Sequence, residues 1–190
     1  MKITKEWLQK EKACIDGLEW FTKQNKEFEP VPLLNLLIKK NQLDWSNWLL
    51  VRVMEYKQYV SYAVYAAEQV IDIFEKEFPD DKHPREAIEA AKKCIENPND
   101  ENKKEAARLA YSTANAASAA YRAEYNAANR AAYWAAESAA YSTADWAAYW
   151  AVDWAAGRVA CAADRTAKSA KILKKILKYG IKLLTEDLGL

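Results

Sequence analysis

Apolar residues recur at helical spacing through most of the 190-residue chain. Between residues 4 and 24 they share roughly one face, which predicts a first helix that Thr4 can N-cap and that runs to about Gln24. Pro30 and Pro32 end whatever precedes them, and Pro32 suits the first turn of a short apolar helix that ends near Asn41. The pattern therefore predicts N-terminal helices within residues 4–43.

The same spacing continues beyond Asp44, which we expect to cap a long helix over residues 45–78. Its polar side chains fall within about 60° of one another at about 100° per residue, so they form a wet face. A further helix is predicted over 85–96, before Asn97 and Pro98. Asn99 or Asp100 can cap the helix that follows. The polar residues of the long helix are Lys57, Ser61, Glu68, Asp72 and Glu75.

Residues 101–177 contain one glycine, Gly157, and no proline. A single rod of that length would exceed about 100 Å at 1.5 Å per residue. We therefore predict at least two or three alanine-rich helices within 101–179, with candidate breaks at 126–129, 141–143 and Gly157. Gly180 is expected to interrupt the last helix.

Alanine occupies every fourth position from 119 to 155, apart from Thr143. Each four-residue step advances the stripe by about 40°, so it spirals and can meet several neighbours in turn. Aromatic and acidic pairs stand between the alanines. The aromatic side chains either fill the spaces between close-packed helices or line a cleft with flat stacking faces.

The charge balance gives no argument for nucleic acid or an anionic membrane as a partner, because 28 basic and 27 acidic residues leave a formal net charge of +1. The three cysteines, Cys14, Cys94 and Cys161, are far apart in sequence and indicate buried, reduced thiols. There is no signal core and no apolar run long enough to span a bilayer, so a cytoplasmic protein is expected. The chain has one histidine, His83, and no glycine-rich phosphate loop. We therefore expect no metal site, no cofactor and no enzymatic activity.

Arg52 lies opposite the wet face of the predicted long helix, beside Tyr56 and Tyr59. A charge on an apolar face needs a partner. That partner is Glu55, an acid of the alanine-rich helices, or water reached by snorkelling. Alternatively, Arg52 faces a pocket and takes a carboxylate or phosphate. The candidate binding residues are Arg52, Tyr56, Tyr59, Arg122, Arg130, Tyr133, Trp134, Trp146, Trp150 and Trp154.

Several segments taken together resemble one known family. They are ACIDGLEWF at 13–21, WLLVRVM at 48–54, YAVYAAEQV at 62–70, FEKEFPDDKHPR at 74–85, AIEAA at 87–91 and KILKKIL at 171–177. The chain resembles the immunity-protein-five-like family, which is associated with bacterial polymorphic toxins. The resemblance implies a helical, non-enzymatic protein.

We therefore expect an all-α fold, a compact multi-helix bundle with an alanine-rich, aromatic-studded half and a single domain over 1–190. The first functional hypothesis is a binding protein that neutralises a toxin or effector by forming a complex. The second is a bacterial or phage sponge that sequesters a small nucleotide immune signal between arginine and aromatic side chains. An enzyme of unfamiliar type is the third. A homodimer would cover the apolar second helix.

Overall fold

The computed structural model describes residues 1–69, 71–77, 79–109 and 167–186. Over these residues the backbone is helical apart from turns, loops and one isolated antiparallel bridge between Ile3 and Phe28, which confirms the all-α prediction. The predicted breaks between 126 and 157 and the aromatic pairs of the alanine repeat lie outside the described residues.

Two short helices replace the single helix expected between residues 4 and 24. They are α1 (Lys5–Lys10) and α2 (Ile15–Lys23). Thr4 caps α1 as predicted, because its hydroxyl accepts the Trp7 N–H at 3.2 Å. Lys12 then adopts a left-handed φ of 59°, and the Ala13 N–H donates to the Leu8 carbonyl at 2.9 Å. This Schellman-type turn ends the first helix.

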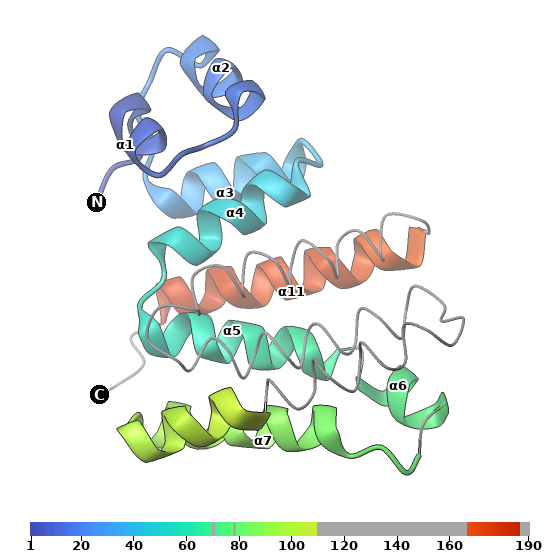
Figure 1. The fold of residues 1–190 in the computed structure, drawn as a ribbon. Coiled ribbons are helices and arrows are strands. Elements are labelled where there is room, and N and C mark those ends of the chain that lie inside the picture. The colour runs from blue at the N-terminus through green and yellow to red at the C-terminus, as the bar shows by residue number, and fades with distance from the viewer. Residues whose placement is uncertain (70, 78, 110–166, 187–190) are drawn as a thin grey trace.

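The predicted apolar second helix is confirmed as α3 (Pro30–Lys39), with proline in its first turn. It ends in the same way as α1. Asn41 has a φ of 59°, and the Gln42 N–H donates to the Leu37 carbonyl at 2.9 Å. The chain reverses there and enters α4 (Leu43–Val53), so Asp44 lies in the first turn of α4 and not at its cap. In Figure 1, α3 and α4 lie side by side under α1 and α2.

The prediction of one helix over 45–78 is wrong. The chain forms α4, α5 (Tyr56–Glu68) and α6 (Ile71–Glu77) instead. Met54 and Glu55 have extended backbones, with ψ of 146° and 167°. The Glu55 N–H donates to Gln58 Oε1 at 2.9 Å. This side-chain oxygen takes the place of the backbone carbonyl to which the Glu55 N–H would donate in a continuous helix. Residues before and after Met54 therefore do not share one helical face.

Residues 83–96 form α7 (His83–Glu96), close to the predicted 85–96. Asn99 caps the next helical segment, 100–109, because its Oδ1 accepts the Asn102 N–H at 2.8 Å, as predicted. The last described helix, α11 (Ala167–Thr185), runs through Gly180 without a break, so the predicted interruption is wrong. Gly180 serves close packing: an added Cβ would meet Leu50 and lie 2.8 Å from Tyr62 Cδ2.

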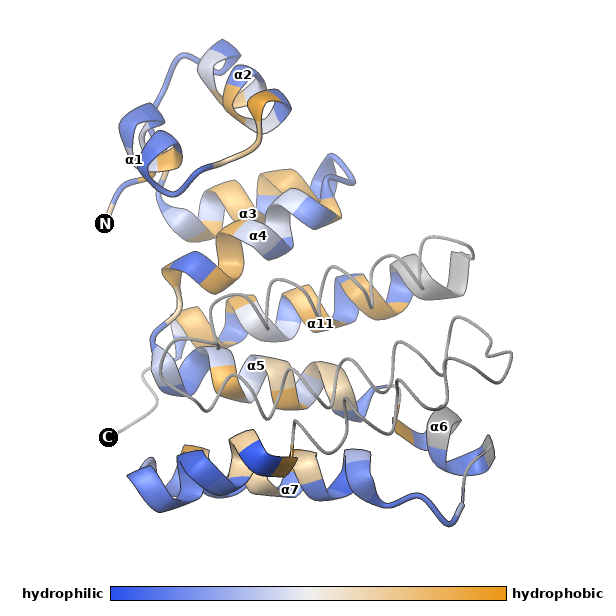
Figure 2. Cartoon of the chain, in the orientation of Figure 1, coloured by the Kyte–Doolittle hydropathy of each residue, from blue (hydrophilic) through white to orange (hydrophobic). Residues whose placement is uncertain are grey.

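The core forms where α11 packs against α4 and α5. Figure 1 shows this arrangement as successive layers, from α1 and α2 through α3 and α4 to α11 and α5, with α7 beyond α5. Figure 2 shows orange apolar bands on α3, α4, α5 and α11 where these layers meet. The fully buried side chains of this core include Leu34, Leu50, Val60, Tyr62, Ile176 and Leu177.

Polar contacts fix the helices relative to one another. The Tyr62 hydroxyl of α5 donates to Asn47 Oδ1 of α4 at 2.7 Å, and both side chains are buried. Gln58 Nε2 donates to the Leu183 carbonyl of α11 at 2.8 Å. Between α6 and α7, the Arg85 guanidinium binds Glu75 through both oxygens, at 2.8 and 2.6 Å, and lowers the pKa of that carboxyl.

We expect Gly180→Ala to lower the free energy of unfolding by about 1–3 kcal/mol, because Leu50 and Tyr62 must move to admit the methyl group. Thermal and urea unfolding would measure the loss. Gly17→Ala in α2 is the matched control, since its Cβ would lie 3.2 Å from Cys14 Sγ and 3.8 Å from Trp45 Cε2. There the gain in helix propensity opposes the tight contact, and we expect a change below about 1 kcal/mol. Equal losses at both positions would contradict the role assigned to Gly180.

Tyr62→Phe should destabilise the fold by about 1–3 kcal/mol, because Asn47 Oδ1 stays buried without its donor. Tyr65→Phe, which keeps the ring stacked on Tyr179 at 3.9 Å, should cost less. Burial also raises the pKa of Tyr62, so the folded chain keeps a proton that the unfolded chain releases above about pH 10. The stability difference between wild type and Tyr62→Phe is therefore complete below about pH 10 and should fall by up to about 1.4 kcal/mol per pH unit above it. Urea unfolding from pH 8 to 11 would show this, and a difference that stays constant with pH would contradict it.

Candidate functional site

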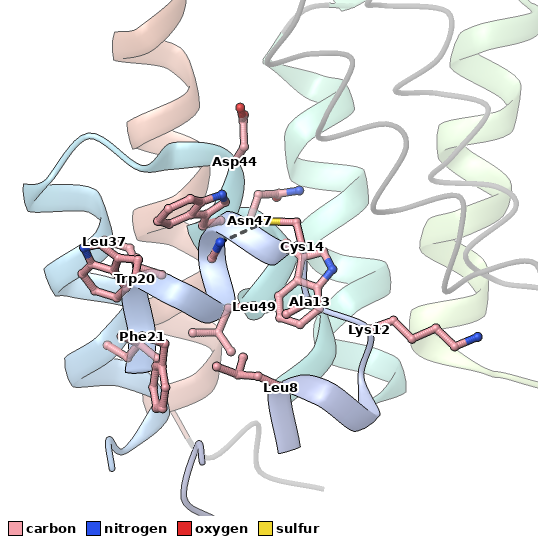
Figure 3. Close-up of a pocket in the computed structure, with 14 residues that line it drawn as sticks. Leu8, Lys12, Ala13, Cys14, Trp20, Phe21, Leu37, Asp44, Asn47 and Leu49 are labelled. Atoms are coloured by element: carbon pink, nitrogen blue, oxygen red, sulfur yellow. Dashed lines mark hydrogen bonds between the residues drawn. The ribbon is translucent and has the colours of Figure 1, made fainter. Parts of the chain in front are cut away.

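The described part of the chain contains an apolar cleft of about 330 Å³ among α1, α2, α3 and α4. Figure 3 shows the side chains that converge on it. Leu33 and Leu37 of α3 and Leu49 of α4 belong to its buried side. The remaining lining residues are Leu8, Lys12, Ala13, Cys14, Gly17, Trp20, Phe21, Asp44, Trp45, Asn47 and Trp48.

Tryptophan side chains supply much of the apolar surface. Trp45 and Trp48 are three residues apart on α4, so both project toward the same side of that helix. Trp20 of α2 packs against Trp45 with ring centroids 5.9 Å apart, and Trp7 of α1 meets the edge of Trp48 at 6.2 Å. These contacts hold α1 and α2 over α4 and leave the cleft between them.

The polar groups of the cleft lie mostly at its edge. Lys12 and Asp44 are exposed, and in Figure 3 their side chains extend outward from it. Cys94 is buried as predicted, but the prediction of a buried thiol is wrong for Cys14. Cys14 is exposed because it caps α2, where its Sγ accepts the Gly17 N–H at 3.4 Å. Ile15, the next residue, has 76% of its surface exposed. Such a cleft suits an apolar side chain of a partner, with charged groups around its opening.

Three of the sequence-predicted binding residues are described, and none of them lines the cleft. The guanidinium of Arg52 lies over the Trp48 ring at 4.0 Å, and its Nη1 donates to the Trp48 carbonyl at 3.0 Å. Tyr56 and Tyr59 meet edge to face at 5.4 Å, with Lys103 Nζ 5.2 Å from the Tyr56 ring. The structure therefore brings the two tyrosines together. Arg52 instead covers the ring of Trp48, which lines the cleft. Outside the described residues lie Arg122, Arg130, Tyr133, Trp134, Trp146, Trp150 and Trp154.

Sequence reasoning missed the cleft, although one signal pointed to it. Four of the eight tryptophans precede residue 50, and two of these are spaced i, i+3. The cleft also depends on the left-handed turn at Lys12, which separates α1 from α2. A lysine at that position carries no turn signature.

The described residues hold no group of three or more His, Cys, Asp or Glu side chains placed to bind a metal ion. Within the same residues, no helix is both long enough and apolar enough to cross a membrane.

The sequence model of the Imm-5 like putative immunity protein family matches residues 50–180, more than half of the chain. The chain belongs to this family. The match confirms the resemblance seen in the sequence, and it begins inside α4. All of the cleft residues precede the matched range. No curated protein and no solved structure matches the chain.

Cys14 offers a chemical probe of the cleft. We expect N-ethylmaleimide to modify Cys14 in the folded chain at least 10-fold faster than Cys94, because the Cys94 side chain is fully buried and reacts only after opening. Peptide mass spectrometry at timed intervals would give both rates. The same reaction in urea is the control, since both thiols should then react at similar rates. Equal rates without urea would contradict the placement of α2.

Proposed function

We propose that the chain neutralises a toxin by forming a complex with it and does not transform it chemically. Membership of an immunity protein family over residues 50–180 is the observation that carries this proposal. Blocking a toxin by complex formation requires a surface that can bind it. This chain offers such a surface, because its packed helices hold side chains in fixed positions.

The cleft supports binding in preference to catalysis. Its walls are aromatic and aliphatic, and tryptophan is enriched among the residues that dominate protein interfaces. Strongly shifted carboxyl groups mark many catalytic sites. Among the described carboxyl groups, Glu6, Glu75 and Glu105 have lowered pKa values. Hydrogen bonds from the backbone and from Thr4 at the start of α1 lower the first, and ion pairs with Arg85 and Arg108 lower the other two. None of the three carboxyl groups lines the cleft.

The proposed contact places an apolar side chain of the toxin between Trp20, Trp45 and Trp48, with exposed Ile15 beside it. Lys12 and Asp44 stand at the edge with opposite charges, which suits a polar rim around an apolar centre. The nucleotide hypothesis gains no comparable support. Its central residue, Arg52, stacks on Trp48 outside the cleft, so we make no second proposal.

Co-expression tests the proposal. Each toxin domain encoded in the same genome would be expressed with and without this chain, and growth and co-purification would be scored. We expect one toxin to be neutralised and to co-purify at equal molar amounts. A catalytic antidote would act at far below one equivalent, and that result, or the absence of any neutralised toxin, would refute the proposal.

Filling the cleft provides the site-specific test. Ala13→Trp should weaken the complex by at least about 10-fold, since loss of one interface anchor costs about 1.4 kcal/mol or more. Gln9→Trp adds the same side chain at an exposed position of α1 that does not line the cleft, and it should leave affinity unchanged. Circular dichroism would confirm that both variants fold. Modification of Cys14 by N-ethylmaleimide is a second block that needs no core substitution. Equal affinity for wild type, Ala13→Trp and the modified chain would exclude the cleft as the contact.

A further inference from the structure

The outer side of α11 carries a row of lysines. Lys171, Lys175, Lys178 and Lys182 fall within about 60° of one another at about 100° per residue. All four are exposed, and they span about 16 Å along the helix axis. We call these four residues the lysine face.

The lysine face lies opposite the buried side of α11. Leu173, Ile176 and Leu177 point into the core together with Gly180, and their mean direction is about 180° from that of the four lysines. Figure 2 shows the consequence as orange and blue bands that alternate along α11. The tight contact of Gly180 with Tyr62 and Leu50 fixes the rotation of the helix, so the lysines are held outward.

Acidic partners for this face are scarce within the part of the chain that the structure describes. Residues 167–185 contain no Asp or Glu. Lys182 reaches Glu186 at 3.5 Å, and Lys175 donates to the neutral Gln69 at 2.8 Å. No carboxylate in the described ranges forms an ion pair with Lys171 or Lys178.

Two basic residues of α7, Lys92 and Arg85, differ from the lysine face because they form close ion pairs. Lys92 lies between Glu68 and Glu89, at 2.9 and 2.8 Å, and Arg85 binds Glu75. The contrast matters because the whole chain has a formal net charge of only +1. The lysine face is thus a row of four exposed cations for which the described residues supply a single ion pair, at 3.5 Å, and such a row suits an electrostatic docking surface.

An aromatic pair borders the lysine face. Tyr65 of α5 and Tyr179 of α11 stack with ring centroids 3.9 Å apart, and Lys175 Nζ lies 5.9 Å from the Tyr65 ring. Both tyrosines are partly exposed. Tyrosine is enriched at protein interfaces, and charged groups belong to their polar rim.

We propose that the lysine face of α11 binds an acidic surface of the toxin. This rests on the proposed function and adds the chemistry of the partner: clustered Asp and Glu side chains along about 16 Å of its surface. The face serves as a second contact beside the cleft, speeds association and sets the orientation of the toxin.

A protein partner fits this face better than a membrane or nucleic acid. The apolar residues of α11 are in the core, so none remains on the lysine face to insert between lipids. A single row of four lysines with no arginine is a small footprint for phosphate backbones. Acidic side chains of a folded partner match four separate ammonium groups at this spacing.

The test uses the full chain and the toxin found by co-expression. The variant Lys171→Gln/Lys175→Gln/Lys178→Gln/Lys182→Gln should bind that toxin about 10- to 100-fold more weakly, mainly through slower association, and lose most of the salt dependence of its association rate. The matched control is Lys5→Gln/Lys23→Gln/Lys39→Gln/Lys104→Gln, which removes the same charge from exposed positions elsewhere. Its association rate should fall less than about 3-fold. Circular dichroism and thermal unfolding would show that both variants fold.

Stopped-flow association at 20 to 500 mM salt separates the outcomes. Equal losses in both variants would assign the effect to net charge and overturn the proposal. Wild-type affinity for the toxin in the first variant would also overturn the proposal. Binding of the unmodified chain to duplex DNA or to vesicles with 25% phosphatidylserine through these lysines would not rescue it in that case. If no toxin binds the unmodified chain, the proposed function fails as well. If the toxin binds the unmodified chain and the lysine-face variant with equal affinity, the proposed function stands and only this inference fails.

Discussion

The contact of Gly180 with Tyr62 and Leu50 joins three helices that are far apart in the sequence. Because Gly180 has no side chain, α11 approaches α4 and α5 closely enough for Tyr62 to be fully buried. The Tyr62 hydroxyl is then satisfied by Asn47, which also lines the cleft from the opposite side. One close approach therefore connects the C-terminal helix, the core and the N-terminal cleft.

Both proposed contact surfaces follow from this arrangement. The rotation of α11 that buries Leu173, Ile176 and Leu177 also turns the lysine face outward. On the other side of the core, α4 is held so that Trp45 meets Trp20 of α2 and Trp48 meets Trp7 of α1. An apolar cleft with oppositely charged groups at its edge and a separate basic row would give a toxin both an anchor and an orientation.

The division between the family-matched part and the N-terminal part has a physical counterpart. Residues 50–180 include α5, α7 and most of α11, which build the core and carry most of the lysine face. The cleft is lined by residues that precede residue 50, from α1, α2, α3, the first part of α4 and the turn between α1 and α2. Under the proposed function, the matched part would supply the scaffold and most of the electrostatic contact, and the residues before it would supply the apolar contact.

The sequence by itself determined the helical class, the C-terminal ends of α3 and α7 and the cap at Thr4, and it limited the cap after α7 to Asn99 or Asp100. Apolar spacing, proline and capping side chains act over one or two turns, so a local stretch of sequence is enough to show them. It also carried the family, through segments of which those at 62–70, 74–85, 87–91 and 171–177 lie within the matched range, whereas 13–21 lies outside it. Only the tertiary structure decided the breaks at Lys12 and Met54, the continuity of α11 through Gly180 and the place of Arg52 on Trp48. Lysine and methionine do not favour the end of a helix, yet helices end near Lys12 and Met54. Glycine does favour it, yet α11 continues through Gly180. Their conformations are set by which distant side chains must pack together, a free-energy balance that no local window of sequence contains.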